Sequence, residues 1–174
     1  MKVWLPLFML CCIFILPLHS HAQTNTPNDY GAKGALEEKN MTLQKALTYA
    51  IEDEYLSQAR YNAFIEKFGD KKPFPAVLQA EQQHIDALLP LLKQNNIAVP
   101  ENKANEYVTA PASLNDAYQE SKQAAIDTTA MYNAFGALPE IPEDVKGVFK
   151  RLGNTSQQHI QLFDQQLQIT PSTP

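Results

Sequence analysis

Cysteine is confined to one place in this 174-residue chain, at Cys11 and Cys12, and histidine is nearly as scarce, with four copies. Both cysteines and two of the histidines lie within the first 22 residues. The rest of the chain therefore has no disulfide and no thiolate ligand. Any metal site there must use Glu, Asp and His, which suit iron, manganese or zinc better than soft ions.

Positively charged residues are outnumbered, because the chain has 14 Lys and Arg and 19 Asp and Glu. Residues 1–22 contribute only Lys2 to this count, so without them 13 basic residues face 19 acidic ones, a net charge of −6. An acidic chain is poorly suited to nucleic acid or to an anionic membrane surface. We therefore expect neither of these as a partner.

Long apolar runs are absent except at residues 4–18. This run follows Lys2 and precedes Ser20-His21-Ala22, a small-x-small pattern typical of signal-peptide cleavage. The run is short for a transmembrane helix, and neither cysteine follows the small residue that a lipoprotein signal needs. We expect residues 1–22 to be a signal peptide, the protein to be periplasmic or secreted, and no stable membrane insertion after cleavage.

Apolar residues recur at helical spacing in four segments, at about residues 42–68, 74–94, 113–135 and 143–167. The connection of residues 97–112 is long and has no clear period, which a helical bundle explains if its second and third helices run parallel. We predict an all-α four-helix bundle over residues 41–168. Around it we expect a flexible tether at 23–40, with one helical turn near Leu36, and a disordered tail at 169–174.

Glu81 and His84 lie three residues apart in the second predicted helix, so both side chains fall on one face, and the apolar residues mark that face as buried. A buried carboxylate needs a partner, and Glu-x-x-His is the ligand pair of carboxylate-bridged metal sites in helical bundles. In the first helix, Glu54 falls in the middle of the apolar stripe. Its neighbours Glu52 and Asp53 fall on a solvated flank, and we assign them no function.

The two halves of the chain repeat each other. Tyr61-Asn62-Ala63-Phe64 recurs as residues 132–135, and Gln82-Gln83-His84-Ile85 recurs as residues 157–160, which suggests a duplicated helical hairpin. The shift that aligns Tyr61 with Tyr132 also aligns Glu54 with Ala125. The shift that aligns His84 with His159 also aligns Glu81 with Ser156. The second half therefore keeps only the histidine. Asp127 lies on a polar face and does not replace the missing carboxylate.

These residues resemble a ferritin-like bacterial family that is catalogued as a domain of unknown function. The resemblance covers roughly residues 42–165 and is carried by Asp53-Glu54-Tyr55 with Tyr61, by Phe68-Gly69, by Pro73-Phe74, by Ala80-Glu81-x-x-His84-Ile85, by Val99-Pro100, by Ala130-Met131-Tyr132 and by Ser156-x-x-His159. It implies a ferritin-like four-helix bundle with a long crossover between its second and third helices. It also implies a central carboxylate/histidine metal site. The family's ligands match Glu54, Glu81, His84 and His159, whereas its third-helix glutamate is Ala125 here.

We therefore predict a site for one transition metal ion, iron first and manganese or zinc next, with Glu54, Glu81, His84 and His159 as ligands. Redox or oxidase activity stays open, as does a homo-oligomer. Tyr61 and Tyr132 are expected to be core residues, with donation of hydrogen bonds to ligands as the alternative. The competing hypothesis for the whole chain is a metal-free bundle, in which these polar groups pair with each other and which acts as a structural or protein-interaction module. A storage cage is disfavoured, because no assembly surface is evident.

Overall fold

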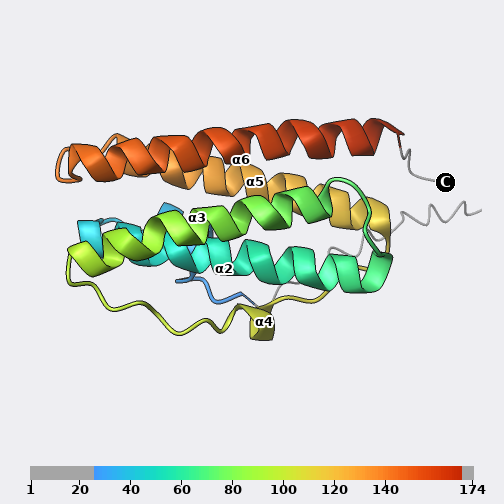
Figure 1. The fold of residues 1–174 in the computed structure, drawn as a ribbon, viewed down its shortest axis with the longest axis horizontal. Coiled ribbons are helices and arrows are strands. Elements are labelled where there is room, and N and C mark those ends of the chain that lie inside the picture. Colours follow the sequence, from blue (N-terminus) through green and yellow to red (C-terminus); the bar gives the residue numbers. More distant parts are fainter. Residues whose placement is uncertain (1–25, 170–174) are drawn as a thin grey trace, which may run out of the picture.

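The computed structural model describes residues 26–169, and every regular element within this range is a helix (Figure 1). Four helices are long: α2 (Leu43–Phe68), α3 (Phe74–Gln94), α5 (Leu114–Gly136) and α6 (Glu143–Ile169). Two are short: α1 (Gly31–Glu37) and α4 (Ala104–Tyr107). The prediction of an all-α chain is confirmed for this range. The expected signal peptide at 1–22 and residues 170–174 of the expected tail lie outside it, whereas Ile169 belongs to α6.

Local chemistry sets the ends of the long helices. The Thr42 hydroxyl accepts a hydrogen bond from the backbone N–H of Lys45 at the start of α2, and the Ser113 hydroxyl accepts one from Asp116 at the start of α5. Such caps satisfy N–H groups that have no partner within the helix. Gly69 ends α2 with a φ of 78°, a conformation that glycine adopts without strain. These signals are all local, which is why the periodic segments matched the helices closely.

The four long helices lie side by side, and the chain direction can be followed by colour in Figure 1. The helices α2 and α3 form one antiparallel hairpin, and α5 and α6 form another. Between the hairpins, residues 95–113 run along the length of the molecule and include α4. As a result α5 begins at the same end as α3, and these two helices run in the same direction.

The apolar interior falls into two clusters along the helices. One includes Leu47, Ile51, Leu88 and Phe149, and the other is built largely of aromatic rings. In the aromatic cluster, Tyr61 stacks on Phe163 with ring centroids 5.9 Å apart, and Phe74 packs against both rings. On α3, Glu81 and His84 fall between Val77 of the aromatic cluster and Ile85 of the other cluster, and Glu54 faces them from α2. The polar group therefore lies near the middle of the long helices, with apolar packing on both sides.

Within the segment expected to be a flexible tether, residues 31–37 form a helix, and this helix contains the turn expected near Leu36. Four residues of α1 are buried, Gly31, Ala32, Gly34 and Ala35, and the preceding Tyr30 is 9% exposed. The helix packs against α2 and α5. A helix of seven residues has little stability of its own, so its order comes from this packing, which the sequence alone does not show.

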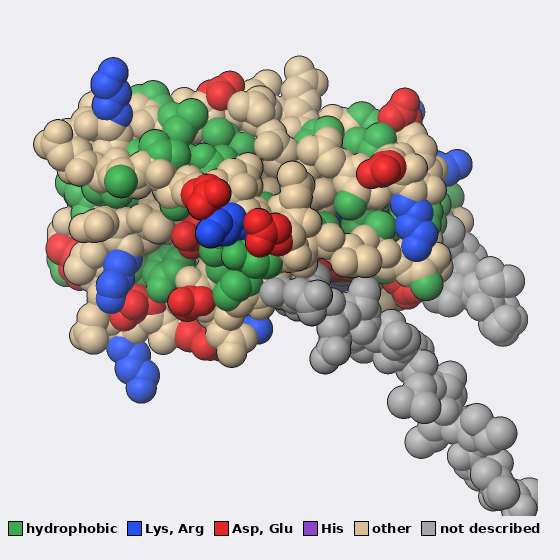
Figure 2. Space-filling view, turned by 90° about the horizontal axis from the view of Figure 1, so that it is seen from below, with side chains coloured by type: hydrophobic (Ala, Val, Ile, Leu, Met, Phe, Trp, Pro, Cys, Tyr) green, Lys and Arg blue, Asp and Glu red, His purple; other side chains and the backbone are tan. Residues whose placement is uncertain are grey.

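Figure 2 shows the molecule from below relative to Figure 1, and on this side acidic and basic side chains are scattered among hydrophobic and uncharged ones. No broad patch of a single charge is seen on this face. Between residues 26 and 169, none of the helices has both the length and the hydropathy required to span a bilayer.

Candidate metal centre

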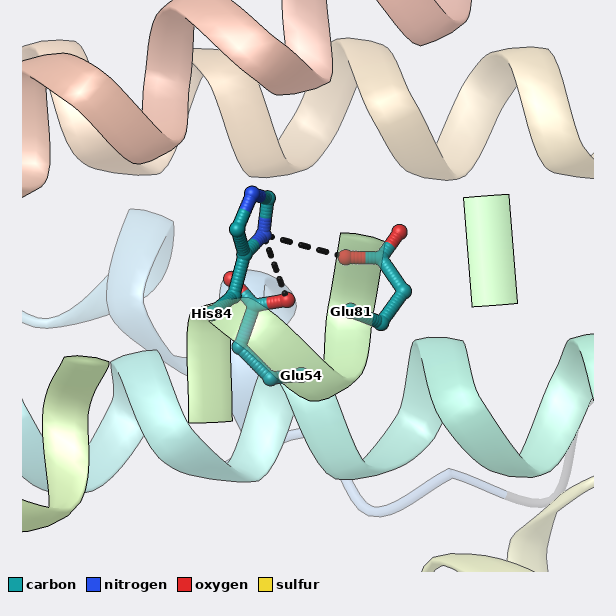
Figure 3. Close-up of side chains that lie close together, drawn as sticks. All are labelled: Glu54, Glu81 and His84. Atoms are coloured by element: carbon teal, nitrogen blue, oxygen red, sulfur yellow. Dashed lines mark hydrogen bonds and ion pairs between the residues drawn. The ribbon is translucent and has the colours of Figure 1, made fainter. Parts of the chain in front are cut away.

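Glu54 of α2 meets Glu81 and His84 of α3 in the interior (Figure 3). The Nδ1 atom of His84 lies 3.2 Å from Oε2 of Glu54 and 3.1 Å from Oε2 of Glu81. All three residues are at least 95% buried, and one donor atom from each lies within 4.8 Å of the other two. Two carboxylates and an imidazole that converge in this way could hold a transition metal ion.

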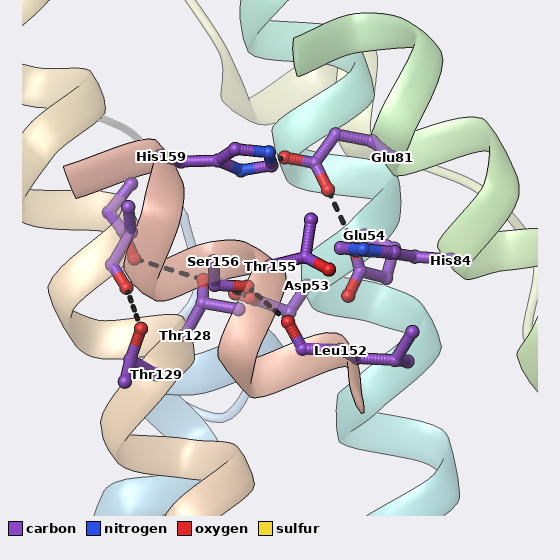
Figure 4. Close-up of polar contacts among 12 residues, drawn as sticks. Asp53, Glu54, Glu81, His84, Thr128, Thr129, Leu152, Thr155, Ser156 and His159 are labelled. Carbon is purple, nitrogen blue, oxygen red and sulfur yellow. Dashed lines mark hydrogen bonds and ion pairs between the residues drawn. The ribbon is translucent and has the colours of Figure 1, made fainter. Parts of the chain in front are cut away.

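His159 of α6 reaches the same carboxylate from the other side (Figure 4). Its Nδ1 atom lies 3.5 Å from Oε1 of Glu81, and its ring is 6.3 Å from that of His84. Each oxygen of Glu81 therefore faces one imidazole. His159 borders the compact group of Glu54, Glu81 and His84 without belonging to it, so the structure brings three of the four predicted ligands together and places the fourth beside them.

Tyr132 of α5 supplies a polar contact that the sequence offered only as an alternative. Its hydroxyl donates a hydrogen bond to Oε1 of Glu54 at 2.5 Å, which leaves Oε2 of that carboxyl facing His84. Gly153 of α6 makes room for the tyrosine, because a Cβ at that position would lie 3.1 Å from Cβ of Tyr132. Its repeat counterpart Tyr61 stacks in the aromatic cluster instead. Tyr132 thus holds the Glu54 carboxyl in one orientation, the role that groups around metal ligands commonly have.

Burial and mutual contacts shift the acid–base properties of the group. Burial raises the pKa of Glu54 to about 8, against the opposing charge of His84. Burial also disfavours a charged His84, but the charge of Glu54 and the hydrogen bonds to both carboxyls outweigh it and raise the pKa of His84 to about 10. For Glu81 burial again opposes charge, yet hydrogen bonds with His159 and His84 hold its pKa well below the usual range. Glu81 is therefore the ionised carboxylate of the group, while Glu54 and His84 each hold a proton more tightly than an isolated side chain would.

The second half of the repeat contributes no carboxylate, as the sequence comparison indicated. Ala125 is buried on α5, and the hydroxyl of Ser156 donates to the carbonyl of Leu152 in its own helix (Figure 4). Asp127 is half-buried and accepts a hydrogen bond from Gln123 on its own helix, so it stays outside the group. The arrangement is lopsided, with a complete donor set on the α2–α3 side and a single histidine on the other.

Asp53 is the residue whose placement the sequence misjudged, because it is 7% exposed and does not lie on a solvated flank. Its Oδ1 accepts the backbone N–H of Ala32 in α1 at 2.9 Å, and its Oδ2 accepts the hydroxyl of Thr128 in α5 at 2.6 Å. The neighbouring Glu52 accepts the N–H of Gly31 at 3.3 Å. The one sequence signal was a second helical row of small or polar residues on α2, formed by Ala46, Ala50, Asp53, Ser57 and Arg60, all of which are buried.

Replacing Tyr132 with phenylalanine should weaken metal binding by about ten- to a hundredfold, the usual effect of removing a group that orients a metal ligand. The variant keeps the ring and loses only the hydrogen bond to Glu54. Calorimetric titration with Zn(II) would measure the change. The matched control is Tyr61→Phe, which removes the hydroxyl at the equivalent position of the repeat. Equal losses in both variants would show that the Tyr132 contact has no special role.

Comparison with known proteins found no matching family model, no matching curated protein and no matching solved structure.

Proposed function

We propose that this chain is an exported, ferritin-like four-helix-bundle protein that binds one transition metal ion through Glu54, Glu81 and His84. The observation that carries the proposal is the convergence of three buried donors within 4.8 Å of one another in the interior. The parallel α3 and α5 joined by a long crossover support the ferritin-like fold. The apolar run and cleavage pattern at residues 1–22 support export to the periplasm or beyond the cell.

The donors fit a borderline or hard ion. Two carboxylates and one imidazole, with no sulfur, suit iron, manganese or zinc, and iron is our first choice. Once bound, such an ion would supply Lewis acidity or, for iron and manganese, a redox couple. The chain's own groups define the surroundings: Tyr132 orients Glu54, Glu81 lies between the two histidines, and apolar clusters on both sides limit access of water.

Metal loading of the purified protein lacking residues 1–22 tests this proposal. We expect close to one ion per chain after incubation with Fe(II), Mn(II) or Zn(II) and removal of the excess, together with a higher melting temperature. A bound ion that prefers the folded state stabilises it in proportion to the logarithm of its concentration. A protein that stays metal-free with all three ions, and whose melting temperature does not change, would refute metal binding. Two ions per chain would show that the second half still holds an ion.

Metal affinity should rise steeply with pH. An entering ion competes with the protons on Glu54 and His84, whose pKa values are about 8 and about 10. The pair must release at least one proton to the solvent when the ion enters, so the logarithm of the Zn(II) binding constant should rise by at least about one per pH unit. Titrations between about pH 6 and 8 would measure this slope. Glu54→Gln should lower it, and a slope near zero in the parent protein would contradict the protonation states.

A metal-free structural role is the second candidate, and one observation favours it. The five buried groups already satisfy one another, since Glu81 faces His84 and His159 while Glu54 contacts His84 and Tyr132. A buried polar network of this kind can specify how helices pack without any ligand. The two candidates make opposite predictions for the stability of a variant in which these groups are replaced by apolar residues.

A further inference from the structure

The short helix α1 touches α2 immediately beside the metal donors. Asp53, which receives the Ala32 N–H, is the residue before Glu54 in the chain. Because the two side chains leave α2 about 100° apart, one faces α1 while the other faces the site. A shift of α2 at this turn would therefore move both carboxyls together.

The same turn of α2 is joined to α5 by two adjacent contacts. Asp53 accepts the Thr128 hydroxyl, and Glu54 accepts the Tyr132 hydroxyl. Thr128 and Tyr132 lie four residues apart, hence one turn apart on α5. The Asp53 contact also involves α1. One oxygen of Asp53 accepts the hydroxyl of Thr128, and the other accepts the backbone N–H of Ala32. Figure 4 shows Asp53 and Thr128 close to the Glu54–His84 pair.

Close packing at Gly31 allows α1 to approach this turn. Gly31 has a φ of 58°, which other residues rarely adopt. A Cβ at this position would also lie 3.0 Å from Oδ1 of Asp53 and 3.1 Å from Leu56. The sequence at the start of α1 is thus adapted to one docked position, in which Ala32 and Ala35 are buried and the helix contacts both α2 and α5.

We propose that α1, docked on Asp53, is a positioning element of the metal site. By fixing α2 relative to α5, it sets the place from which Glu54 meets Tyr132 and the ion, so undocking α1 weakens metal binding. Asp53 itself is a positioning residue, since both of its oxygens are already occupied by Ala32 and Thr128. This inference rests on the proposed function and extends it to residues 26–37, a segment that supplies no metal donor.

The test compares variants in the protein lacking residues 1–22, with Co(II) as the probe, because its visible absorption reports the ligand geometry as well as the affinity. We expect Gly31→Ala and Asp53→Ala to weaken Co(II) binding by about tenfold or more and to change the spectrum, as loss of support around ligands does. Asp53→Asn should stay within about twofold of the parent. Its amide oxygen can accept the Ala32 N–H, and its amide nitrogen can donate to the Thr128 oxygen, whose hydroxyl hydrogen is then free to be donated to the carbonyl of Ala124.

Gly69→Ala is the matched control for backbone strain. Gly69 also has a positive φ, of 78°, but a Cβ there would meet nothing within 4 Å. This variant should be destabilised and still bind Co(II) as the parent does. Unchanged affinity and spectrum in Gly31→Ala and Asp53→Ala would overturn the inference, and so would an equal loss of affinity in Gly69→Ala.

A metal-independent measurement separates this inference from the proposed function. If the parent protein binds no Co(II), the proposed function fails. Whether α1 positions the Glu54–Tyr132 contact can still be tested by the NMR signals of the labelled Tyr132 ring, which are assigned with Tyr132→Phe. A shift of these signals in Gly31→Ala but not in Gly69→Ala supports the coupling between α1 and the Glu54–Tyr132 contact. Signals that do not move in Gly31→Ala overturn it.

Discussion

Replacing Glu81 with alanine is expected to abolish metal binding and to lower the free energy of unfolding of the metal-free protein by about 3–5 kcal/mol. Glu81 is 4% exposed, and its two oxygens face His84 and His159. Hydrogen bonds with these two histidines hold its pKa below the usual range, so it is the anion of the group. Its removal leaves the buried His159 without a carboxylate and His84 with Glu54 alone, and it deletes the carboxylate that joins the two halves of the site. Urea denaturation and Zn(II) titration would measure the two effects.

Two further variants make this result specific. Glu66→Ala removes an exposed carboxylate from α2 and should change stability by no more than about 0.5 kcal/mol, as surface substitutions usually do. Glu81→Gln keeps the shape and one acceptor oxygen, so it should recover part of the stability while metal binding stays lost. A Glu81→Ala protein that still holds one ion per chain would rule out Glu81 as a ligand.

The long helices could be predicted closely because their signals lie within the chain itself. The stripes of apolar residues, the caps at Thr42 and Ser113 and the breaks at Gly69 and Pro73 are all local features. The placement of Glu81 and His84 on one buried face follows from their spacing of three. The burial of Glu54 could be predicted too, because it lies on the apolar stripe of its own helix.

Contacts between distant segments could not be predicted in the same way. The burial of Asp53 depends on α1, which has little apolar periodicity and is ordered by packing against α2. The choice of Tyr132 over Tyr61 as the partner of Glu54 depends on how α5 crosses α2 and on the space that Gly153 leaves. His159 lies outside the compact group because of the distances between helices. The sequence repeat shows only that His159 corresponds to His84 in position along its helix.

An apolar replacement of the whole polar group should stabilise the metal-free protein, even though the loss of Glu81 alone destabilises it. We consider the combined variant Glu54→Met, Glu81→Met, His84→Leu, His159→Leu and Tyr132→Phe. Burying charged and polar groups costs desolvation energy, and well-packed apolar residues of similar volume avoid that cost. Tyr132 is included because its hydroxyl would otherwise lose its acceptor. We expect a gain of about 1–4 kcal/mol in the free energy of unfolding, measured in urea with a chelator present.

This result separates the two candidate functions, because each predicts a different sign. If the group binds metal, its buried polar side chains lower the stability of the metal-free protein. The apolar variant should then be more stable and bind no metal. If the group is structural, its hydrogen bonds specify the packing of α2, α3, α5 and α6. The apolar variant should then be less stable, or should lose the cooperative transition and the dispersed NMR spectrum of a uniquely packed core. His84→Leu alone is the control for packing volume. It leaves Glu54 and Glu81 without their shared imidazole and should be destabilised under either function, so only the combined variant decides between them.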